Sequence, residues 1–261
     1  MNFMPIASII SHRGLPHPST LVLHPDYAAL EPFMRSLPER MANGEGTVIH
    51  KGRNELRIMT YGGHELVVKA FRRPHLINQF VYGTLRASKA KRSYDNALLL
   101  QSLGIGTPQP VGYYNIRSVL GLRFDRSYFV TLRSACTHRY EALFEQHFSY
   151  EADVLRAIGA LTAKLHEHGL AHKDYGRANI LFEQRPDGSI ALELVDLNRM
   201  AVGPLDIAAG CKNFERLPAT PQMHRWMAET YAKARHFDAE QCFKLMESYR
   251  ATQGGKIDGK Y

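Results

Sequence analysis

The stretch that decides the fold is Leu170-Ala171-His172-Lys173-Asp174-Tyr175-Gly176-Arg177-Ala178-Asn179-Ile180-Leu181-Phe182. It contains the pattern H-x-D-x-x-x-x-N, formed by His172, Asp174 and Asn179. An apolar run follows and ends in Val195-Asp196-Leu197-Asn198. A lone Asp or Asn is usually a turn residue or a cap. This spacing, with a second aspartate at the end of a predicted strand, is much harder to reach by chance and is typical of a kinase active site.

The chemistry of phosphoryl transfer explains why these residue types recur in this order. Asp174 is the candidate that orients the acceptor hydroxyl and takes its proton, because this reaction depends mostly on alignment and charge neutralisation. Asn179 and Asp196 are the expected Mg2+ ligands, since this ion prefers oxygen ligands and retains water. His172 belongs to the same catalytic segment, and we expect it to brace the loop beneath Asp196 rather than to react.

A lysine at the end of a predicted strand is the candidate ligand of the ATP phosphates. The run Leu66-Val67-Val68-Lys69 is much like the V-A-I-K strand of kinases, whose lysine pairs with a helix glutamate. Between Ala70 and Phe124 the sequence holds one acidic residue, Asp95. Asp95 is therefore the candidate partner of Lys69, and its short side chain requires a closer helix or a water. The alternative is an exposed helix charge beside Lys91.

The predicted nucleotide loop departs from the usual kinase pattern. No G-x-G-x-x-G precedes Lys69, and the first turn, Lys51-Gly52-Arg53-Asn54, has a single glycine. We expect backbone amides near Gly52 to cover the phosphates and Arg53 to add a positive charge. The sequence also lacks G-x-x-x-x-G-K-[ST], which disfavours a Walker-type ATPase.

The order of predicted elements indicates an α+β, bilobal protein-kinase-like fold. Residues 1–42 are predicted to be a variable lead-in, because prolines interrupt any long helix. Residues 43–133 are predicted to form a nucleotide-binding N-lobe, a small twisted antiparallel sheet with one helix over about 84–103. Residues 134–261 are predicted to form a mainly helical C-lobe with the catalytic loop. The expected strands are 47–50, 55–61, 65–71, 111–114 and 127–133, and the expected helices of the C-lobe are 151–169, 221–235 and 238–252.

Composition narrows the class of protein. The chain has 261 residues, 44% of them hydrophobic, which is enough for one large domain or two lobes. Its three cysteines are widely spaced, without C-x-x-C, and indicate reduced thiols in a cytoplasmic protein. We expect no signal peptide, because no cationic start precedes a long apolar run. No apolar run is long enough to cross a bilayer, so any membrane contact is expected to be peripheral.

The net charge of +8 favours an anionic partner without choosing among nucleotide, acidic glycolipid and membrane surface. Basic residues gather around the predicted helix without an interspersed carboxylate. They form either a solvated helix face or a patch for an acidic acceptor or an anionic bilayer. Nucleic acid is disfavoured because aromatic and basic residues do not alternate regularly in this cluster. The cluster comprises Arg72, Arg73, Arg86, Lys89, Lys91 and Arg92.

At this point the chain resembles the lipopolysaccharide kinase (Kdo/WaaP) family of the protein-kinase-like superfamily. The resemblance rests on segments 51–54, 67–71, 88–97, 104–110, 172–182 and 195–199. It implies an enzyme that uses ATP and Mg2+ to phosphorylate Kdo or heptose of the lipopolysaccharide inner core, at the cytoplasmic face of the inner membrane. We expect the protein to be a monomer. Two departures stand out. Asp95 replaces a usual glutamate, and Gly176 leaves no lysine two residues after the catalytic aspartate. Either one implies slow turnover or altered nucleotide handling.

Three other functions stay open on the residues alone. A protein kinase usually needs a long activation segment and A-P-E, whereas residues 199–210 are short and lack that signature. An antibiotic-type phosphotransferase would favour an acidic pocket for cationic drugs, which the charge disfavours. A non-catalytic pseudokinase is compatible with the degenerate nucleotide loop, although Lys69, Asp174, Asn179 and Asp196 are all retained.

Overall fold

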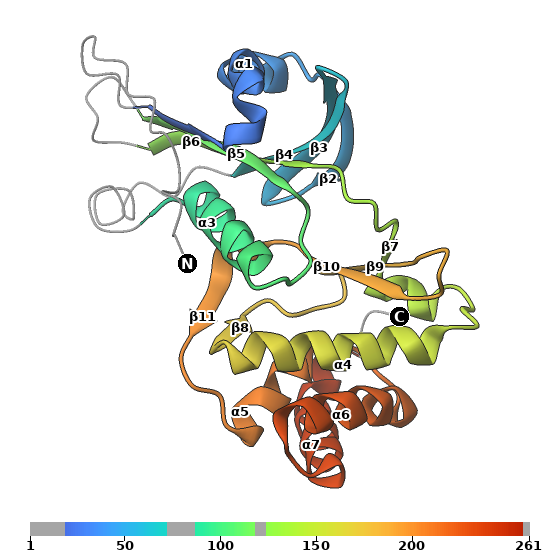
Figure 1. The fold of residues 1–261 in the computed structure, drawn as a ribbon. Helices are drawn as coiled ribbons and strands as arrows, with labels where there is room; N and C mark the ends of the chain where they lie inside the picture. The colour runs from blue at the N-terminus through green and yellow to red at the C-terminus, as the bar shows by residue number, and fades with distance from the viewer. Residues whose placement is uncertain (1–18, 72–86, 118–123, 258–261) are drawn as a thin grey trace. The chain divides into compact units, whose positions relative to one another are not determined.

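The computed structural model describes residues 19–71, 87–117 and 124–257. The described chain divides into two compact units (Figure 1). The first runs to Leu98 and resumes over Pro108–Arg133, and the second comprises Leu99–Thr107 and everything from Ser134 onward. The sequence-based boundaries differ from this division, because they placed 99–107 in the N-lobe and separated 1–42 from it.

The first unit is built on a twisted antiparallel sheet of the described strands. Five of them lie where the sequence predicts strands, and the edge strand β1 is an addition from the expected lead-in. The order across the sheet is β1-β5-β6-β4-β3-β2. The strands are β1 (Thr20–Leu23), β2 (Thr47–Lys51), β3 (Asn54–Tyr61), β4 (His64–Phe71), β5 (Pro110–Arg117) and β6 (Phe124–Leu132). All their pairings are antiparallel.

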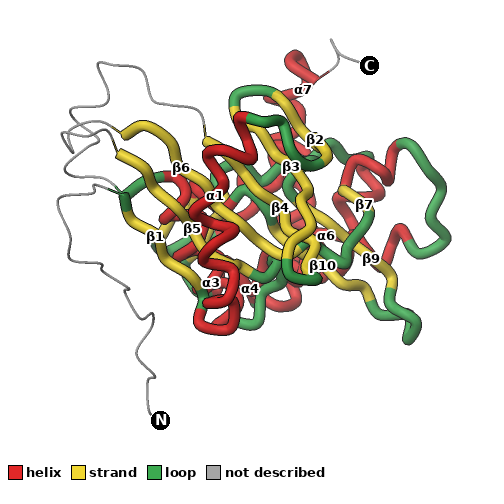
Figure 2. Tube along the Cα trace, turned by 90° about the horizontal axis from the view of Figure 1, so that it is seen from above, coloured by secondary structure: helices red, strands yellow, loops and turns green. Residues whose placement is uncertain are grey.

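One face of this sheet is covered by a helix that the sequence analysis did not expect. After the 3-10 turn η1 (Pro25–Leu30), α1 spans Glu31–Ala42 and lies across the strands (Figures 1 and 2). Pro32 sits in its first turn, where a missing N–H costs nothing. Pro38 lies inside the helix and does remove a bond.

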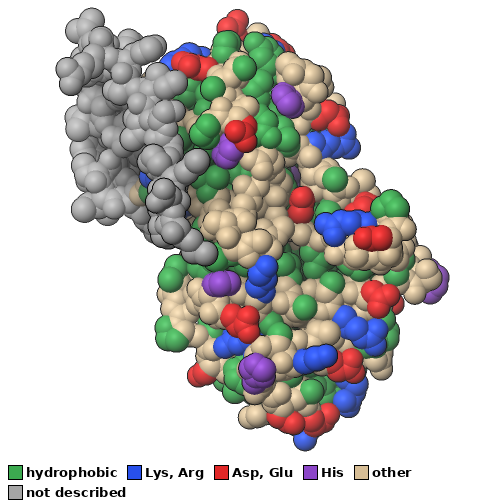
Figure 3. Space-filling view, in the orientation of Figure 1, with side chains coloured by type: hydrophobic (Ala, Val, Ile, Leu, Met, Phe, Trp, Pro, Cys, Tyr) green, Lys and Arg blue, Asp and Glu red, His purple; other side chains and the backbone are tan. Residues whose placement is uncertain are grey.

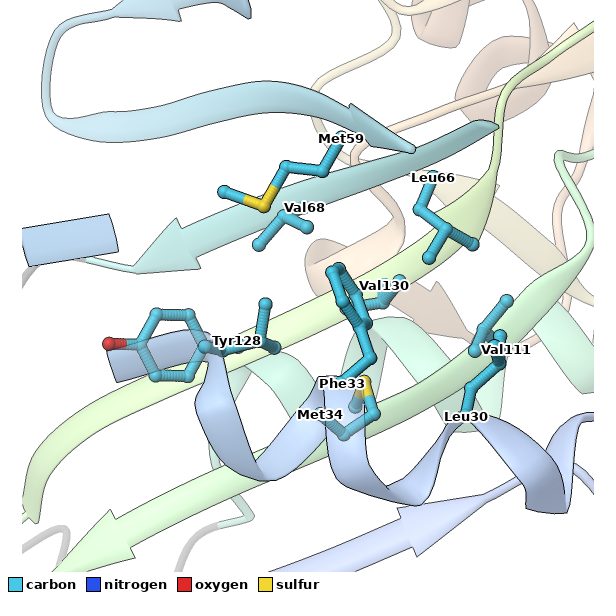
Figure 4. Packing of buried hydrophobic residues seen from close by; sticks show 10 residues of the cluster. Leu30, Phe33, Met34, Met59, Leu66, Val68, Val111, Tyr128 and Val130 are labelled. Carbon is cyan, nitrogen blue, oxygen red and sulfur yellow. The ribbon is translucent and has the colours of Figure 1, made fainter. Parts of the chain in front are cut away.

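Burial of the apolar side of α1 outweighs the cost of Pro38. Phe33, Met34 and Leu37 are fully buried against β3, β4, β5 and β6 (Figure 4). The described residues from Thr20 to Ala42 are therefore part of the first unit, and their interpretation as a lead-in was wrong. Residues 1–18 lie outside the described residues.

The opposite face of the sheet packs against α3 (Lys89–Ser102). Ala90 and Tyr94 of α3 form a buried cluster with Val22, Phe71 and Tyr113 from the strands. The helix ends where predicted, because Gly104 takes a left-handed φ of 63° that most residues avoid. The predicted start at 84–86 lies outside the described residues.

The second unit is mainly helical, as predicted. The long helix α4 (Glu151–Glu167) packs against α6 (Pro221–Arg235), and α6 packs against α7 (Ala239–Ile257). Two small sheets, ordered β10-β9-β7 and β11-β8, carry the loops beside α4. Their strands are β7 (His138–Arg139), β8 (Leu170–His172), β9 (Ile180–Gln184), β10 (Ile190–Leu194) and β11 (Met200–Val202). The short elements are η2 (Tyr140–Phe144), η3 (Leu197–Arg199), α5 (Ile207–Lys212) and η4 (Asn213–Arg216).

Candidate active site

The predicted catalytic loop joins β8 to β9 within the second unit. Asp174 follows β8, and Asn179 directly precedes β9. The side-chain Nδ2 of Asn179 donates to the carbonyl oxygen of Asp174 at 2.8 Å, which closes the loop on itself. The hydroxyls of Tyr175 and Thr162 lie 2.7 Å apart and tie the loop to α4. The loop is thus held by its own side chains and by the neighbouring helix.

The segment that carries Asp196 is joined to the same loop through the backbone. The N–H of Val195 donates to the carbonyl oxygen of Asn179 at 3.0 Å. On the other side, β11 pairs with β8 so that Met200 lies opposite His172. Asp196 therefore belongs to a segment that is hydrogen-bonded directly to the loop of Asp174 and Asn179, although it lies later in the sequence.

His172 is fully buried, and its hydrogen bonds determine its tautomer. Its Nδ1 accepts from the backbone N–H of Asp174 at 3.1 Å. The other nitrogen, Nε2, lies 3.1 Å from the carbonyl oxygen of Val195, which can only accept. Nε2 therefore carries the proton. Both ring nitrogens are used to link the loop of Asp174 to the segment that leads to Asp196.

Asp196 and Asn179 present the kind of atoms that Mg2+ binds. Since Nδ2 of Asn179 donates to a carbonyl, its Oδ1 is left as an acceptor, and it makes no hydrogen bond within the described residues. Asp196 is half-buried and adopts a left-handed φ of 61°, which costs energy for a residue other than glycine. Its Oδ1 accepts from Nδ2 of Asn198 at 2.5 Å. One amide oxygen and one carboxylate fit the preference of Mg2+ for oxygen.

Two arginines contact Asp174, and the sequence analysis assigned neither a role. Nη1 of Arg199 donates to both carboxylate oxygens, at 2.9 and 3.3 Å. Nη1 of Arg216 donates to Oδ1 at 3.0 Å and also to the carbonyl oxygen of Lys173 at 3.2 Å. The sequence offered a signal only for Arg199, which directly follows Asp196-Leu197-Asn198. Arg216 lies 42 residues after Asp174, too far for any local pattern.

A buried hydrogen-bond chain beneath the loop was also missed. Nδ2 of Asn213 donates to the carbonyl oxygen of His172 at 2.9 Å, so its Oδ1 must accept from Nε2 of His166 at 3.1 Å. Nδ1 of His166 then accepts from the Tyr231 hydroxyl at 2.9 Å. Burial lowers the pKa of His166 to about 4, which keeps this histidine neutral. This series of hydrogen bonds connects α4 and α6 to the predicted catalytic loop.

The segment Gly104–Thr107 packs on β10, just before Asp196. The N–H of Leu194 donates to the carbonyl oxygen of Gly106 at 2.9 Å, and Thr107 Oγ1 donates to the carbonyl oxygen of Leu194 at 2.8 Å. A Cβ on Gly106 would lie 1.9 Å from the carbonyl oxygen of Leu192. Only glycine therefore allows this close approach.

The remaining candidates lie in the first unit. Lys69 is buried at 9% exposure, on the side of β4 that Phe71 shares, and this face packs against α3. Its Nζ lies 5.3 Å from the centre of the Phe71 ring. Gly52 and Arg53 form the exposed turn between β2 and β3, with the N–H of Gly52 donating to the carbonyl oxygen of Asn54 at 3.1 Å.

Asp95 lies on the exposed side of α3. Its carboxylate accepts from Nζ of Lys91 at 2.8 Å, an i,i+4 pair, and this hydrogen bond raises the pKa of Lys91. The proposed pairing of Asp95 with Lys69 stays a prediction. In the basic cluster, Arg72, Arg73 and Arg86 lie outside the described residues, whereas Lys89, Lys91 and Arg92 are on α3.

Comparisons with known proteins identify a matching family and similar solved structures. The sequence model of the lipopolysaccharide kinase (Kdo/WaaP) family matches residues 44–247. A search of curated proteins finds no match. A solved structure described as WaaP in complex with acyl carrier protein matches 92% of this chain and 99% of its own, at 16% identity and a TM-score of 0.60. The Rio2 kinase–ADP/Mg2+-phosphoaspartate complex from Chaetomium thermophilum matches 88% of this chain and 77% of its own, at 17% identity and a TM-score of 0.48.

The family match covers most of the chain and includes every segment of the candidate site. The likeness to the WaaP structure agrees with it in fold and confirms the predicted protein-kinase-like α+β class. No helix in the described ranges combines the length and the apolar character needed to cross a membrane. The chain belongs to the lipopolysaccharide kinase (Kdo/WaaP) family, whose members are phosphotransferases that act on sugar hydroxyls.

Proposed function

We propose that this protein transfers the γ-phosphate of ATP to a hydroxyl of Kdo or heptose in the lipopolysaccharide inner core. Membership of the family supports a sugar kinase of the lipopolysaccharide core. The structural observation that supports phosphoryl transfer is the set of hydrogen bonds that join Asp174, Asn179 and the Asp196 segment.

Asp174 is the residue proposed to act on the acceptor. Its side chain is 24% exposed, which leaves the carboxylate accessible while its loop is fixed by Asn179 and His172. The acceptor oxygen attacks the γ-phosphorus, the bond from the γ-phosphorus to the β–γ bridging oxygen breaks, and the hydroxyl proton passes to the carboxylate. ADP leaves with the bridging oxygen. A loop held at both ends supplies the alignment on which this reaction depends.

Asn179 and Asp196 are proposed to hold Mg2+ through an amide oxygen and a carboxylate. When bound, the ion neutralises charge on the phosphate oxygens. The left-handed backbone of Asp196 and the hydrogen bond from Asn198 limit the orientations of its carboxylate before any ligand arrives. Lys69 is proposed to contact the α- and β-phosphates with Asp95 as its acidic partner, and Gly52 and Arg53 to cover the phosphates.

The direct test is phosphate transfer with purified protein, ATP, Mg2+ and inner-core glycolipid, followed by mass spectrometry of the product. We expect the acceptor to gain one phosphate, and fragmentation would assign it to Kdo or heptose. Core lipid isolated from cells with and without the gene should show the same difference. Transfer to a protein or an aminoglycoside instead of the core sugar would contradict the proposal.

Contact with the inner membrane is a further part of the proposal, because a glycolipid acceptor is anchored there. Lys89 and Lys91 of α3 belong to the basic cluster that favours an anionic surface. In the face shown in Figure 3, basic and acidic side chains are interspersed over the described residues. We propose the basic cluster as the site of membrane contact.

A protein partner is suggested by the WaaP structure, which is a complex with acyl carrier protein. We propose the same class of partner for this chain, and its net charge of +8 would favour an acidic carrier. Co-purification of the carrier with the tagged protein would support this pairing. Separate elution of the two proteins at low salt would exclude it.

A further inference from the structure

We propose that Arg199 and Arg216 form a subsite for an anionic group, a carboxylate or phosphate, on the acceptor sugar next to the hydroxyl that Asp174 activates. This inference deepens the proposed function and rests on it. It assigns a specificity role to two residues that no kinase motif includes, and all of its contacts lie within the second unit.

Neither arginine uses its full hydrogen-bonding capacity on Asp174. Both donate to the carboxylate through Nη1 alone, and no other donor of either guanidinium makes a hydrogen bond within the described residues. Arginine binds an oxyanion most strongly when two nitrogens donate in parallel to two oxygens. In each arginine, the Nε and Nη2 donors on one edge of the guanidinium are thus available to bind another anion.

The charges around Asp174 are not balanced. Two guanidiniums surround one carboxylate, which leaves an excess positive charge beside the proposed catalytic group. The side chains are 57% exposed at Arg199 and 53% at Arg216, so both can reach a bound sugar. A neutral hydroxyl needs only the carboxylate of Asp174. A second positive charge at this point is explained by an acceptor that carries its own negative charge.

Both arginines are fixed relative to the loop. The carbonyl oxygen of Arg199 accepts from the N–H of Lys173 at 3.0 Å, and Nη1 of Arg216 donates to the carbonyl oxygen of Lys173 at 3.2 Å. Lys173 directly precedes Asp174. The anion and the reacting hydroxyl are therefore held by one rigid group of residues, as orientation of the acceptor requires.

The test compares two small acceptors that differ only at the carboxyl group, the methyl glycoside of Kdo and its neutral methyl ester. With wild-type protein we expect kcat/KM to be at least about tenfold higher for the carboxylate, as for one charge-assisted hydrogen bond. In Arg199→Gln and Arg216→Gln this preference should shrink toward one, because activity on the acid falls more than activity on the ester. Phosphorylated and unphosphorylated heptose glycosides, run in parallel, show whether a phosphate is the anion recognised.

Two further variants separate recognition from folding. Arg216→Lys keeps the charge but loses the planar pair of donors, so it should fall between wild type and Arg216→Gln. Arg225→Gln is the matched control, because Arg225 is similarly exposed at 47% but pairs with Glu240, away from the loop. It should leave the preference unchanged.

Three results would overturn the inference: wild-type protein that shows no preference for the anion in either pair of acceptors, variants that slow the anionic and neutral acceptors equally, or a preference that survives both substitutions. The second result would show that the arginines only position Asp174. If no sugar is phosphorylated at all, the proposed function fails. Binding of the acid and the ester, measured by calorimetry without ATP, then still decides whether the two arginines select the anion.

Discussion

The side-chain amide of Asn213 donates to the carbonyl oxygen of His172 at 2.9 Å, across 41 residues of sequence. The same amide accepts from His166. One side chain thereby satisfies two buried groups and supports the loop from below. Buried polar groups left without partners cost about 1–3 kcal/mol each, so this residue is important for stability as well as for the site.

Replacing Asn213 with alanine should therefore lower the free energy of unfolding by about 2–4 kcal/mol, because the His172 carbonyl and His166 Nε2 lose their partner together. Chemical denaturation measures the change. Asn213→Asp is the informative companion, since it keeps the acceptor for His166 and loses the donor to His172. We expect it to be intermediate, and equal stability of all three proteins would contradict the role assigned to this amide.

The protein should become less stable as the pH falls from about 6.5 to 4. In the folded state the pKa of His166 is about 4, below its ordinary value of 6.5, so in this range the unfolded chain binds a proton that the folded chain does not. The expected loss between pH 7 and pH 5 is about 2 kcal/mol. Denaturation curves of wild type and His166→Gln at both pH values isolate this contribution, because the carboxylates titrate equally in the two proteins and cancel from the difference. Parallel pH profiles would show that His166 does not titrate as stated.

Asp174→Ala should reduce turnover by at least about 100-fold and leave ATP affinity nearly unchanged, since the residue is proposed to act on the acceptor. Asp196→Ala should instead weaken binding of ATP in the presence of Mg2+. Measuring ATP affinity by calorimetry and turnover by product formation separates the two roles. Normal turnover in Asp174→Ala would mean that the hydroxyl is activated elsewhere.

Gly106→Ala should destabilise the protein by about 1–3 kcal/mol, because the added methyl would overlap the backbone of Leu192 and force the segment off β10. Gly176→Ala is the matched control. The nearest atoms to its new Cβ are 3.8 Å away, and its φ is not left-handed. A thermal melt of both variants gives the comparison, and equal melting temperatures would rule out the steric argument.

Binding to anionic vesicles should weaken as the salt concentration rises from about 0.05 to 0.5 M, because dissolved ions screen the positive charge of the basic cluster. Sedimentation with vesicles that contain phosphatidylglycerol measures it, and neutral vesicles serve as the control. Retention that is independent of salt, or equal on both vesicle types, would contradict a membrane contact based on charge.

The sequence predicted the elements whose signals are local. The spacing of Asp174 and Asn179, the hydrophobic periodicity of α4 and the turn at Gly104 each depend on a few neighbouring residues. The helix α1 was missed because Pro32 and Pro38 reduce local helix propensity, whereas burial of Phe33 and its neighbours against the sheet decides the outcome. Packing of that kind is invisible in a short window of sequence.

The same distinction holds within the candidate site. Arg216 and Asn213 reach the loop only because η4 and β8 come together in three dimensions, and no motif marks them. The partner of Asp95 also depends on tertiary contacts, and in the structure Asp95 pairs with Lys91, one helical turn away.

The segment that supports β10 comes from residues 104–107, and the rest of its unit begins at Ser134. Cutting the gene at codon 134 would therefore not yield an autonomous catalytic half. The fragment would leave the amide of Leu194 without its acceptor, and we would expect it to aggregate. Coexpressing the two pieces, rather than expressing either alone, is the way to recover folded material from a split protein.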